Sequence, residues 1–577
     1  MRLPRIEAGV VEQGPVATIV LGGSLLVSGL WARTPWWVLA VVVGGLLTLV
    51  AVRVNSRSGV RWLLDWIDYR FGRTARARAR IDAEEVDDIE VAAGTCGIKT
   101  ADTVLVAMIQ LAPNLDLPTV IAERSVYTED TIPIAALLPM LEHYGIAVDI
   151  DIVTTGQRIR PTGSYSMLYD QLIGAHPVVG HRLTWLVVRL DLERNLAALR
   201  RRGPVEVMAP KALATAAHRI AGRLRERGIS AHALPAVALR EASRTLHLGV
   251  ELPDLREKWS CLESSTPGRF VTSFQVDWSR LGGAGLDDCW AWHRGWTTLV
   301  VSLTGAATEL RAIARYVGPQ VTTSPPDYLR LLTGRQSAAL SATLPSGSTA
   351  HRLPSHGSRA EIPWSELRAD LTVAIGPNGQ ILGSISGQPR HTLALPLFDP
   401  ARYNPRRRTV DVHAVLPVAQ QLILRAMVVG ADVEVHSTRP QRWSQLVAAV
   451  GDPNSLRMAQ DMRGSESGSS STTDPQPAPA TIAVFDNLPP YPSSAQTTVT
   501  ISDPGGPRQR SVDLAIDQVD PNTVDVSIPM RTVRVDLIEP WGETRYFGGA
   551  EPHSASVATN GAVVPHAGSP SAGHRVS

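Results

Sequence analysis

The sequence predicts a mixed α/β soluble domain carried on a two-helix transmembrane hairpin at the N-terminus. Three observations predict this fold class: two adjacent apolar runs near the start, an alternation of strand-like and helix-like segments after residue 100, and an abrupt change of composition at Gly464. Beyond that change, short strand-like runs could form a small β-rich C-terminal appendage, and an Ala/Ser/Gly/Pro-rich end predicts a disordered tail. With 577 residues, the chain has room for two or three domains after the hairpin, at roughly 150 residues each.

The two apolar runs, at residues 16–32 and 35–52, contain no charged residue. A helix that crosses a bilayer needs roughly 17–25 such residues. Indole rings favour the membrane–water interface, and three tryptophans stand at the turn between the runs: Trp31, Trp36 and Trp37. A cleaved signal peptide is the alternative, but it would leave the second run unexplained. We therefore predict two membrane spans that turn at one interface.

Basic residues gather behind the second run and are nearly absent from the turn between the runs. Those next to the membrane are Arg53, Arg57 and Arg61. Because Lys and Arg near span ends stay on the cytoplasmic side, both termini and the rest of the chain are predicted to face the cytoplasm. Three cysteines without CxxC spacing agree with a reducing compartment: Cys96, Cys261 and Cys289.

Composition and periodicity divide the chain into six regions. These are the hairpin (1–53), a basic juxtamembrane segment (54–100), an α/β region (101–460), a flexible linker (461–480), the β-rich appendage (481–548) and the disordered tail (549–577). The juxtamembrane segment either lies along the membrane surface and attracts anionic lipids, or serves only as a topological signal.

Within the α/β region, apolar or alternating runs predict strands at 103–111, 146–154 and 184–192. Helical periodicity predicts helices at 132–145 and 210–228. Such an alternation predicts a sheet with parallel elements that is covered by helices.

A second set of elements follows. Residues 371–385 predict a β-hairpin that turns at an Asn-Gly pair, and residues 410–450 predict a compact β-α-β-α unit.

The motifs of common enzyme classes are missing from the chain. It contains no GxxxxGK[ST], HExxH, GxSxG or GxGxxG. A net charge of +2 argues against a general polyanion binder. We therefore predict a non-enzymatic protein with no catalytic residue, no cofactor and no nucleic acid partner.

Asp149 and Asp151 form a DxD pair on the predicted strand at 146–154. Two carboxylates at this spacing could bind Mg²⁺ or Mn²⁺, as in many glycosyltransferases that hold a nucleotide-sugar pyrophosphate. The apolar neighbours point to the other face, so a half-buried strand with a solvated acidic face also accounts for the pair. We prefer this second interpretation.

Cys289 and His293 lie four residues apart and would share one face of a helix. With Asp287 and Asp288 adjacent, they could begin a metal site or form a nucleophile–base pair. Nothing in the sequence marks a third ligand, and the surrounding tryptophans favour a packed structural cluster: Trp290, Trp292 and Trp296.

The passage YDQLIGAHPVVGHRLTWLVVRLDLERNLAALRRRG, at residues 169–203, resembles the core segment of the EccE family of type VII (ESX) secretion systems. The helix at 210–228 and the two apolar runs are also similar to that family, and the EccE-like core extends over about residues 101–300. The residues that carry the core resemblance are Tyr169, Gln171, Gly174, Arg182, Trp185, Arg189, Asp191, Asn195, Arg201 and Gly203.

This resemblance implies a structural subunit of the inner-membrane translocon, assembled with subunits of the EccB, EccC and EccD families and with membrane lipids. EccC supplies the ATPase in such systems, which agrees with the missing P-loop. The soluble domain of the family has been likened to glycosyltransferase folds. The alternative is therefore a membrane-anchored glycosyltransferase-like enzyme, or a nucleotide-sugar-binding module, that would use Asp149 and Asp151.

Overall fold

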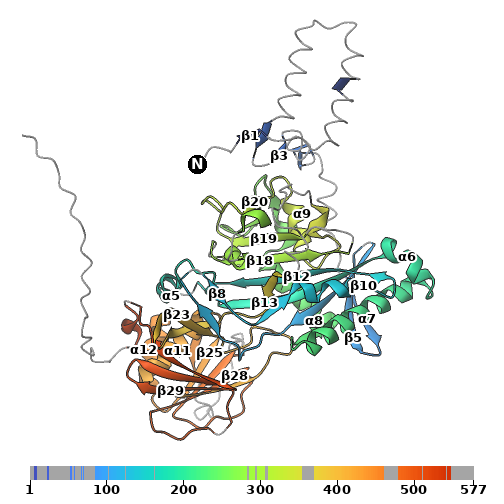
Figure 1. The fold of residues 1–577 in the computed structure, drawn as a ribbon. Helices are drawn as coiled ribbons and strands as arrows, with labels where there is room; N and C mark the ends of the chain where they lie inside the picture. The colour runs from blue at the N-terminus through green and yellow to red at the C-terminus, as the bar shows by residue number, and fades with distance from the viewer. Residues whose placement is uncertain are drawn as a thin grey trace, which may run out of the picture.

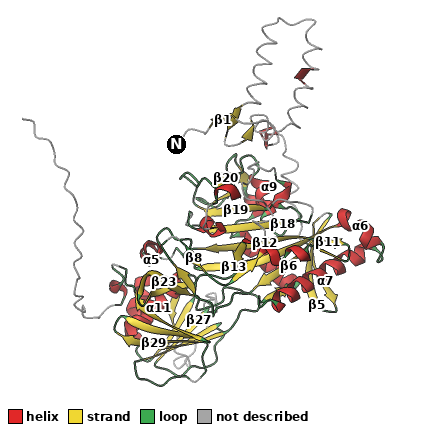
Figure 2. Cartoon of the chain, in the orientation of Figure 1, coloured by secondary structure: helices red, strands yellow, loops and turns green. Residues whose placement is uncertain are grey.

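Two large β-sheets dominate the fold, which is seen in a computed structural model. The structure describes residues 6–8, 23–24, 52–54, 57–58, 66–67, 69–70 and 85–547, except 102, 124, 162, 282–284, 293–294, 306–309, 354–369, 460–478, 510 and 541. In this part of the chain each of the two sheets has twelve strands, and helices pack against them (Figure 1, Figure 2).

The first sheet is antiparallel throughout. Its strands lie in the order β15-β16-β17-β19-β18-β12-β13-β6-β5-β4, with β14 beside β6 and β20 beside β17. Their bounds are β4 Val86–Val91, β5 Gly94–Ala101, β6 Val104–Leu111, β12 Asp149–Gln157, β13 His181–Asp191, β14 Ala231–Ala233, β15 Arg256–Glu257, β16 Leu262–Glu263, β17 Phe270–Val276, β18 Trp296–Leu303, β19 Arg311–Gly318 and β20 Leu329–Leu331.

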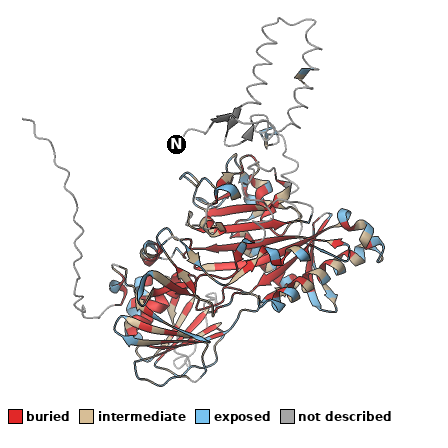
Figure 3. Ribbon diagram, in the orientation of Figure 1, coloured by how far each residue is buried: buried red, intermediate tan, exposed pale blue. Residues whose placement is uncertain are grey.

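Helices cover both faces of this sheet, which explains why its central strands are long apolar runs. Alternate residues of a strand point to opposite faces. Leu186 of β13 lies in the same buried cluster as residues of α7 (Val205–Glu226), whereas Val187 lies in a cluster with residues of α8 (Ala236–His247). Figure 3 shows buried residues along the strands of both sheets. The other helices and 3₁₀ turns near this sheet are α6 Leu192–Arg200, η3 Leu252–Asp254, η4 Trp278–Arg280, η5 Gly285–Trp290, α9 Gln336–Ala342 and η6 Ala350–Arg352.

The second sheet has a parallel half and an antiparallel half. Its order is β26-β25-β27-β28-β24-β29-β30-β31-β22-β23-β7-β8, and the pairs from β26 to β29 are parallel. The bounds are β7 Thr119–Ile121, β8 Val126–Tyr127, β22 Gln380–Ile385, β23 Gln388–Leu395, β24 Arg408–His413, β25 Val433–Ser437, β26 Leu456–Met458, β27 Ile482–Asp486, β28 Thr497–Ser502, β29 Leu514–Asp520, β30 Thr523–Ile528 and β31 Arg531–Leu537.

Helix α11 (Leu416–Val428) is the central helix of this second half. All its residues except Pro417 are buried, as expected for a helix that is apolar around most of its circumference. The elements beside it are α5 Tyr165–Ile173, α12 Pro440–Val450 and η8 Thr544–Tyr546. Small pairings complete the fold: β1 Ile6–Ala8 with β2 Val52–Val54, β2 with β3 Arg57–Ser58, β9 Thr131–Pro133 with β21 Thr372–Ala374, and β10 Glu142–His143 with β11 Ile146–Ala147.

The predicted fold class is wrong in its balance of elements. The described chain is β-rich, and its first sheet contains no parallel pair where parallel elements were predicted. The residues predicted as a small β-rich appendage instead supply β27 to β31 to the second sheet. Their parallel partners β24 and β25 come from residues 408–437, so these strands do not stand apart from the rest of the fold.

The predicted transmembrane hairpin is also corrected. None of the helices in the described ranges is long and apolar enough to cross a membrane. Val52, placed at the end of the second span, begins strand β2. Arg53 and Arg57 lie in β2 and β3, and Gly23 and Ser24 are helical. The remaining residues of the two spans lie outside the described residues, as do Trp31, Trp36, Trp37 and Arg61.

Asp130 links three segments near the boundary between the two sheets. Its Oδ2 accepts hydrogen bonds from the backbone N–H of Asn114 at 3.3 Å and of Gly376 at 3.0 Å. Burial has the largest effect on the pKa of this carboxyl, which is raised to about 6.

We expect Asp130→Asn to remove a pH dependence of stability. The folded pKa of about 6 lies above the unfolded value. The carboxyl therefore stabilises the fold fully below about pH 4, and this stabilisation is lost as the pH rises through about 6. Asparagine keeps the acceptor oxygen without the charge. At pH 8 the variant should be more stable by about 1–3 kcal/mol, and at pH 4 the two proteins should be equal in urea unfolding. An equal difference at both pH values would contradict this explanation.

Candidate docking surface

The two aspartates of the DxD pair are held by arginines. Asp151 is fully buried and forms an ion pair with Nη1 of Arg189, whose Nε also donates to the Ser346 carbonyl at 2.6 Å. Asp149 accepts from Nη1 of Arg194 at 3.0 Å. The predicted solvated acidic face is therefore wrong for Asp151. A metal would have to displace an arginine from each carboxylate.

Cys289 lies in the core beside an aromatic cluster. It is completely buried in η5, and its pKa is raised by burial and by the charges of Asp287 and Asp288. Its predicted partner His293 lies outside the described residues. The neighbouring Trp292 packs edge-to-face on Phe274 and Tyr316, with ring centroids 5.4 and 5.0 Å apart. A thiol in this position is a packing group rather than a nucleophile.

We expect the cysteines of the native protein to resist alkylation. Burial raises the pKa of Cys96 to about 12 and also raises the pKa values of Cys261 and Cys289. At pH 8 the thiolate fraction should therefore be very small. Iodoacetamide labelling followed by mass spectrometry should modify Cys289 at least 100-fold more slowly than in urea. Rapid labelling of native Cys289 would revive the nucleophile hypothesis.

Three residues of the EccE-like motif lie buried on β13: Arg182, Trp185 and Arg189. The Arg182 guanidinium lies 5.2 Å from the centroid of the Trp290 ring and 3.6 Å from Oδ1 of Asp287. The motif and the Cys289 segment, which the sequence presents as separate signals, thus meet in one buried cluster.

Other motif residues fix the elements around β13. Asp191 caps α6 by accepting from the N–H groups of Glu193 at 2.9 Å and Arg194 at 3.2 Å. Asn195 donates to the carbonyl of Ala147 at 2.9 Å and accepts from its N–H at 2.7 Å. The first turn of α6 is therefore attached to strand β11.

The remaining motif residues lie at either end of this region. The Tyr169 hydroxyl accepts from the N–H of Ile381 at 2.8 Å and so connects α5 with β22. Gly174 ends α5 with a φ of +61°, and Gly203 precedes α7 with a φ of +145°, both favourable for glycine. Three motif residues are exposed: Gln171, Gly174 and Arg201. The ten residues serve the fold and do not converge on one cavity.

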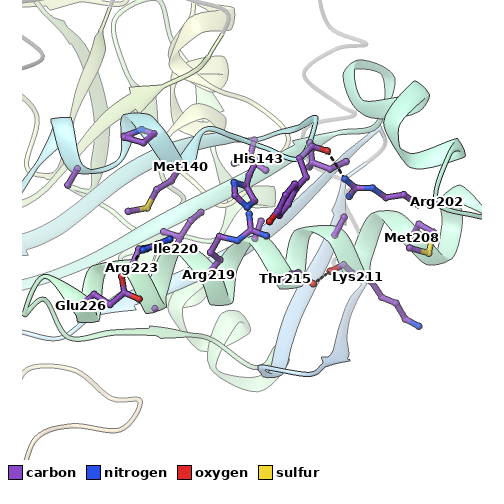
Figure 4. A pocket seen from close by; sticks show the side chains of 18 of the residues that line it. Met140, His143, Arg202, Met208, Lys211, Thr215, Arg219, Ile220, Arg223 and Glu226 are labelled. Atoms are coloured by element: carbon purple, nitrogen blue, oxygen red, sulfur yellow. Dashed lines mark hydrogen bonds and ion pairs between the residues drawn. The ribbon is translucent and has the colours of Figure 1, made fainter.

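A groove of about 1030 Å³ runs along α7 (Figure 4). Its opposite wall consists of residues from η1 (Ile134–Ala136), η2 (Leu138–Met140), β10 and β11. The floor is apolar and includes Met140, Ile146, Met208 and Ile220.

Basic side chains border this groove. Residues at intervals of four are neighbours on a helix, and one such stripe, which runs along α7 to the residue just after it, lines the groove and is basic except for Thr215: Lys211, Thr215, Arg219, Arg223 and Arg227. Arg202 adds a further guanidinium, whereas Glu226 is the lone carboxylate among the lining residues.

The loop between β10 and β11 faces this stripe. Tyr144, which is 79% exposed, lies with its ring centroid 5.6 Å from Cζ of Arg219, and its carbonyl accepts from Nη2 of Arg202 at 2.6 Å. Figure 4 shows His143 next to Arg219. Desolvation, followed by the charges of Arg219 and Arg223, lowers the pKa of His143, so this ring is neutral at pH 7.

This groove was not predicted from the sequence, where the periodicity at residues 210–228 predicted only a helix. The basic stripe from Lys211 to Arg227 was present in the same helical period and could have been recognised. The opposite wall could not, because residues 132–145 were predicted to form a helix and residues 146–154 a strand.

A second basic hollow, of about 670 Å³, lies between the two sheets. Its arginines are Arg160, Arg244, Arg269 and Arg402. Arg160 is already paired with Asp432 at 2.7 Å, and Arg402 with Glu241 at 3.5 Å. The α7 groove, whose cations have fewer partners, is therefore the better candidate for a docking surface.

Comparison with known proteins matches a part of the chain that includes one wall of the groove to a known family. Residues 178–276 match the family model described as "EccE: Putative type VII ESX secretion system translocon, EccE". The match begins just before β13 and ends at the last residue of β17, so it includes α7.

Several curated relatives extend this similarity over more of the chain. The chain is 26% identical to the ESX-2 secretion system protein EccE2 of Mycobacterium tuberculosis, over 80% of this chain and 83% of that protein. It is 27% identical to the ESX-1 secretion system protein EccE1 of Mycolicibacterium smegmatis, over 55% of this chain and 65% of that protein. It is 28% identical to the ESX-5 secretion system protein EccE5 of Mycobacterium marinum, over 56% of this chain and 82% of that protein.

Proposed function

The chain is a member of the EccE family, and from this premise we propose that it is a non-enzymatic structural subunit of a type VII (ESX) secretion translocon. In this proposal it supports protein export by assembling with subunits of the EccB, EccC and EccD families. The observation that carries the proposal is the family match at residues 178–276, together with the alignment of most of the chain to EccE2.

The geometry of the candidate catalytic residues supports a structural role. Asp151 forms an ion pair with Arg189 inside the core, and Asp149 forms an ion pair with Arg194. The Cys289 thiol is completely buried and therefore inaccessible to a substrate. A glycosyltransferase-like enzyme would need the two aspartates at the mouth of a pocket, and they line neither of the two hollows described above.

We further propose that the protein works at the inner membrane with its folded part facing the cytoplasm. The family supports the membrane association. The three cysteines are unpaired and buried, which agrees with a reducing compartment. Membrane fractionation, followed by protease treatment of intact spheroplasts, should find the tagged chain with membranes and protected. Digestion from the outside would contradict the orientation.

The test of the assembly is affinity purification of the tagged chain from native membranes in mild detergent. EccB-, EccC- and EccD-type proteins should co-purify in one large complex, as identified by mass spectrometry. An unrelated membrane protein with the same tag serves as the control. Recovery of the chain alone, as a monomer, would overturn the proposal.

A further inference from the structure

We propose that the groove along α7 binds an acidic, amphipathic segment of another subunit of the secretion complex. This inference rests on the proposed function and adds the chemistry of the partner. It follows from three properties of the groove, which are its charge, its apolar floor and its length.

The charge of the groove is not neutralised within the described residues. Arg223 pairs with Glu226 at 3.0 Å, at a site where both side chains are more than 60% exposed. No carboxylate in this part of the chain pairs with Lys211, Arg219 or Arg227. A partner that brings carboxylates to this stripe would gain complementary charge without displacing a strong internal ion pair.

The apolar floor distinguishes a protein segment from other anions. Met140, Ile146 and Met208 line the groove together with the basic residues. Phosphate backbones are bound mainly by polar and charged groups, so the apolar part of the groove would offer a nucleic acid no partner. A helix with one acidic and one apolar side matches both parts of the groove.

The stripe has the length of a peptide-binding site. Lys211 and Arg227 are sixteen positions apart, which corresponds to about 24 Å along a helix. An occupant would therefore be a helix of about four turns, or an extended segment of about seven residues. Methionines such as Met140 and Met208 adapt to side chains of different shape.

The occupant can be identified by photocrosslinking in native membranes. p-Benzoylphenylalanine would replace Thr215, an exposed residue in the groove, in the full-length chain. The matched control carries it at Val207, which is 50% exposed on the same helix but does not line the groove. We expect position 215, and not position 207, to crosslink to a segment of another ESX subunit that has several Asp or Glu residues on one side and apolar residues on the other.

Charge reversal then tests the recognition. Lys211→Glu combined with Arg223→Glu should lower the crosslink yield at least tenfold, and Arg225→Glu, on the same helix outside the groove, should leave it within twofold. An unchanged thermal unfolding midpoint would show that each variant folds. Changing two acidic residues of the crosslinked segment to lysine should restore the yield with the double variant.

Three results would overturn the inference: a crosslink from position 215 only to lipid, nucleic acid or a second copy of this chain; no specific crosslink; or a yield that charge reversal does not lower. If the wild-type chain still co-purifies with ESX subunits, the proposed function survives and only the inference fails. If the wild-type chain recovers no ESX subunit, both fail.

Discussion

Asp151→Ala is expected to destabilise the folded protein by about 3–5 kcal/mol, because it leaves a buried guanidinium without its counter-ion. Arg189 is 2% exposed, and its other acceptors among the described residues are the backbone carbonyls of Ser346 at 2.6 Å and Leu344 at 3.1 Å. Neither carbonyl carries a formal charge. The loss should appear in urea unfolding of the purified chain followed by tryptophan fluorescence.

The matched control is Asp149→Ala, two residues away on the same strand. Its partner Arg194 is 32% exposed in its side chain, so water can solvate the guanidinium when the carboxylate is removed. The expected loss is about 1 kcal/mol or less. The comparison also separates the two hypotheses for the DxD pair. If both variants are as stable as the wild type and only an activity is lost, the aspartates belong to an active site and the structural interpretation is wrong.

Glu543→Ala is expected to have an effect of similar size, about 3–5 kcal/mol. Oε2 of Glu543 lies 3.1 Å from Nη2 of Arg425 and accepts from Nε2 of Gln421 at 2.8 Å, and Oε1 accepts from the Tyr165 hydroxyl. Both charged side chains are completely buried. This network holds the C-terminal segment against α11 and α5, so limited proteolysis should cleave near residue 543 much faster in the variant.

Two further variants distinguish the effect of the buried charge of Glu543 from the effect of any change in this segment. Glu539→Ala changes an exposed carboxyl in the same segment and should cost about 0.5 kcal/mol or less. Arg425→Leu combined with Glu543→Leu removes both charges and should be less destabilised than the sum of the single changes. If the losses of stability of the two single variants sum to that of the double variant, the ion pair contributes nothing to the free energy of unfolding.

The regular strands were predictable because their periodicity is local. The runs predicted at 103–111 and 184–192 correspond to β6 and β13, and the helix predicted at 210–228 corresponds to α7. In each case one continuous apolar or amphipathic pattern is long enough to determine the element.

Predictions from local patterns were wrong where prolines, or strand pairing with residues far away in sequence, decided the structure. The helix predicted at 132–145 is wrong, because Pro133 and Pro139 lack the N–H that a helix needs, and only two 3₁₀ turns form. The hairpin predicted at 371–385 is also wrong. Its two strands, β21 and β22, pair with β9 and with β23 and β31, so they do not pair with each other.

The sequence by itself determined the family resemblance, the main strands of the first sheet, the helix with the basic stripe and the absence of common catalytic motifs. Tertiary structure alone decided that Asp151 is buried against Arg189, that strands from residues 482–537 complete the second sheet, and that residues 134–148 form the second wall of the α7 groove. The reason is physical. Periodicity along the chain fixes which face of an element is apolar, whereas the partner of that face comes from residues far away in sequence, and only packing selects it.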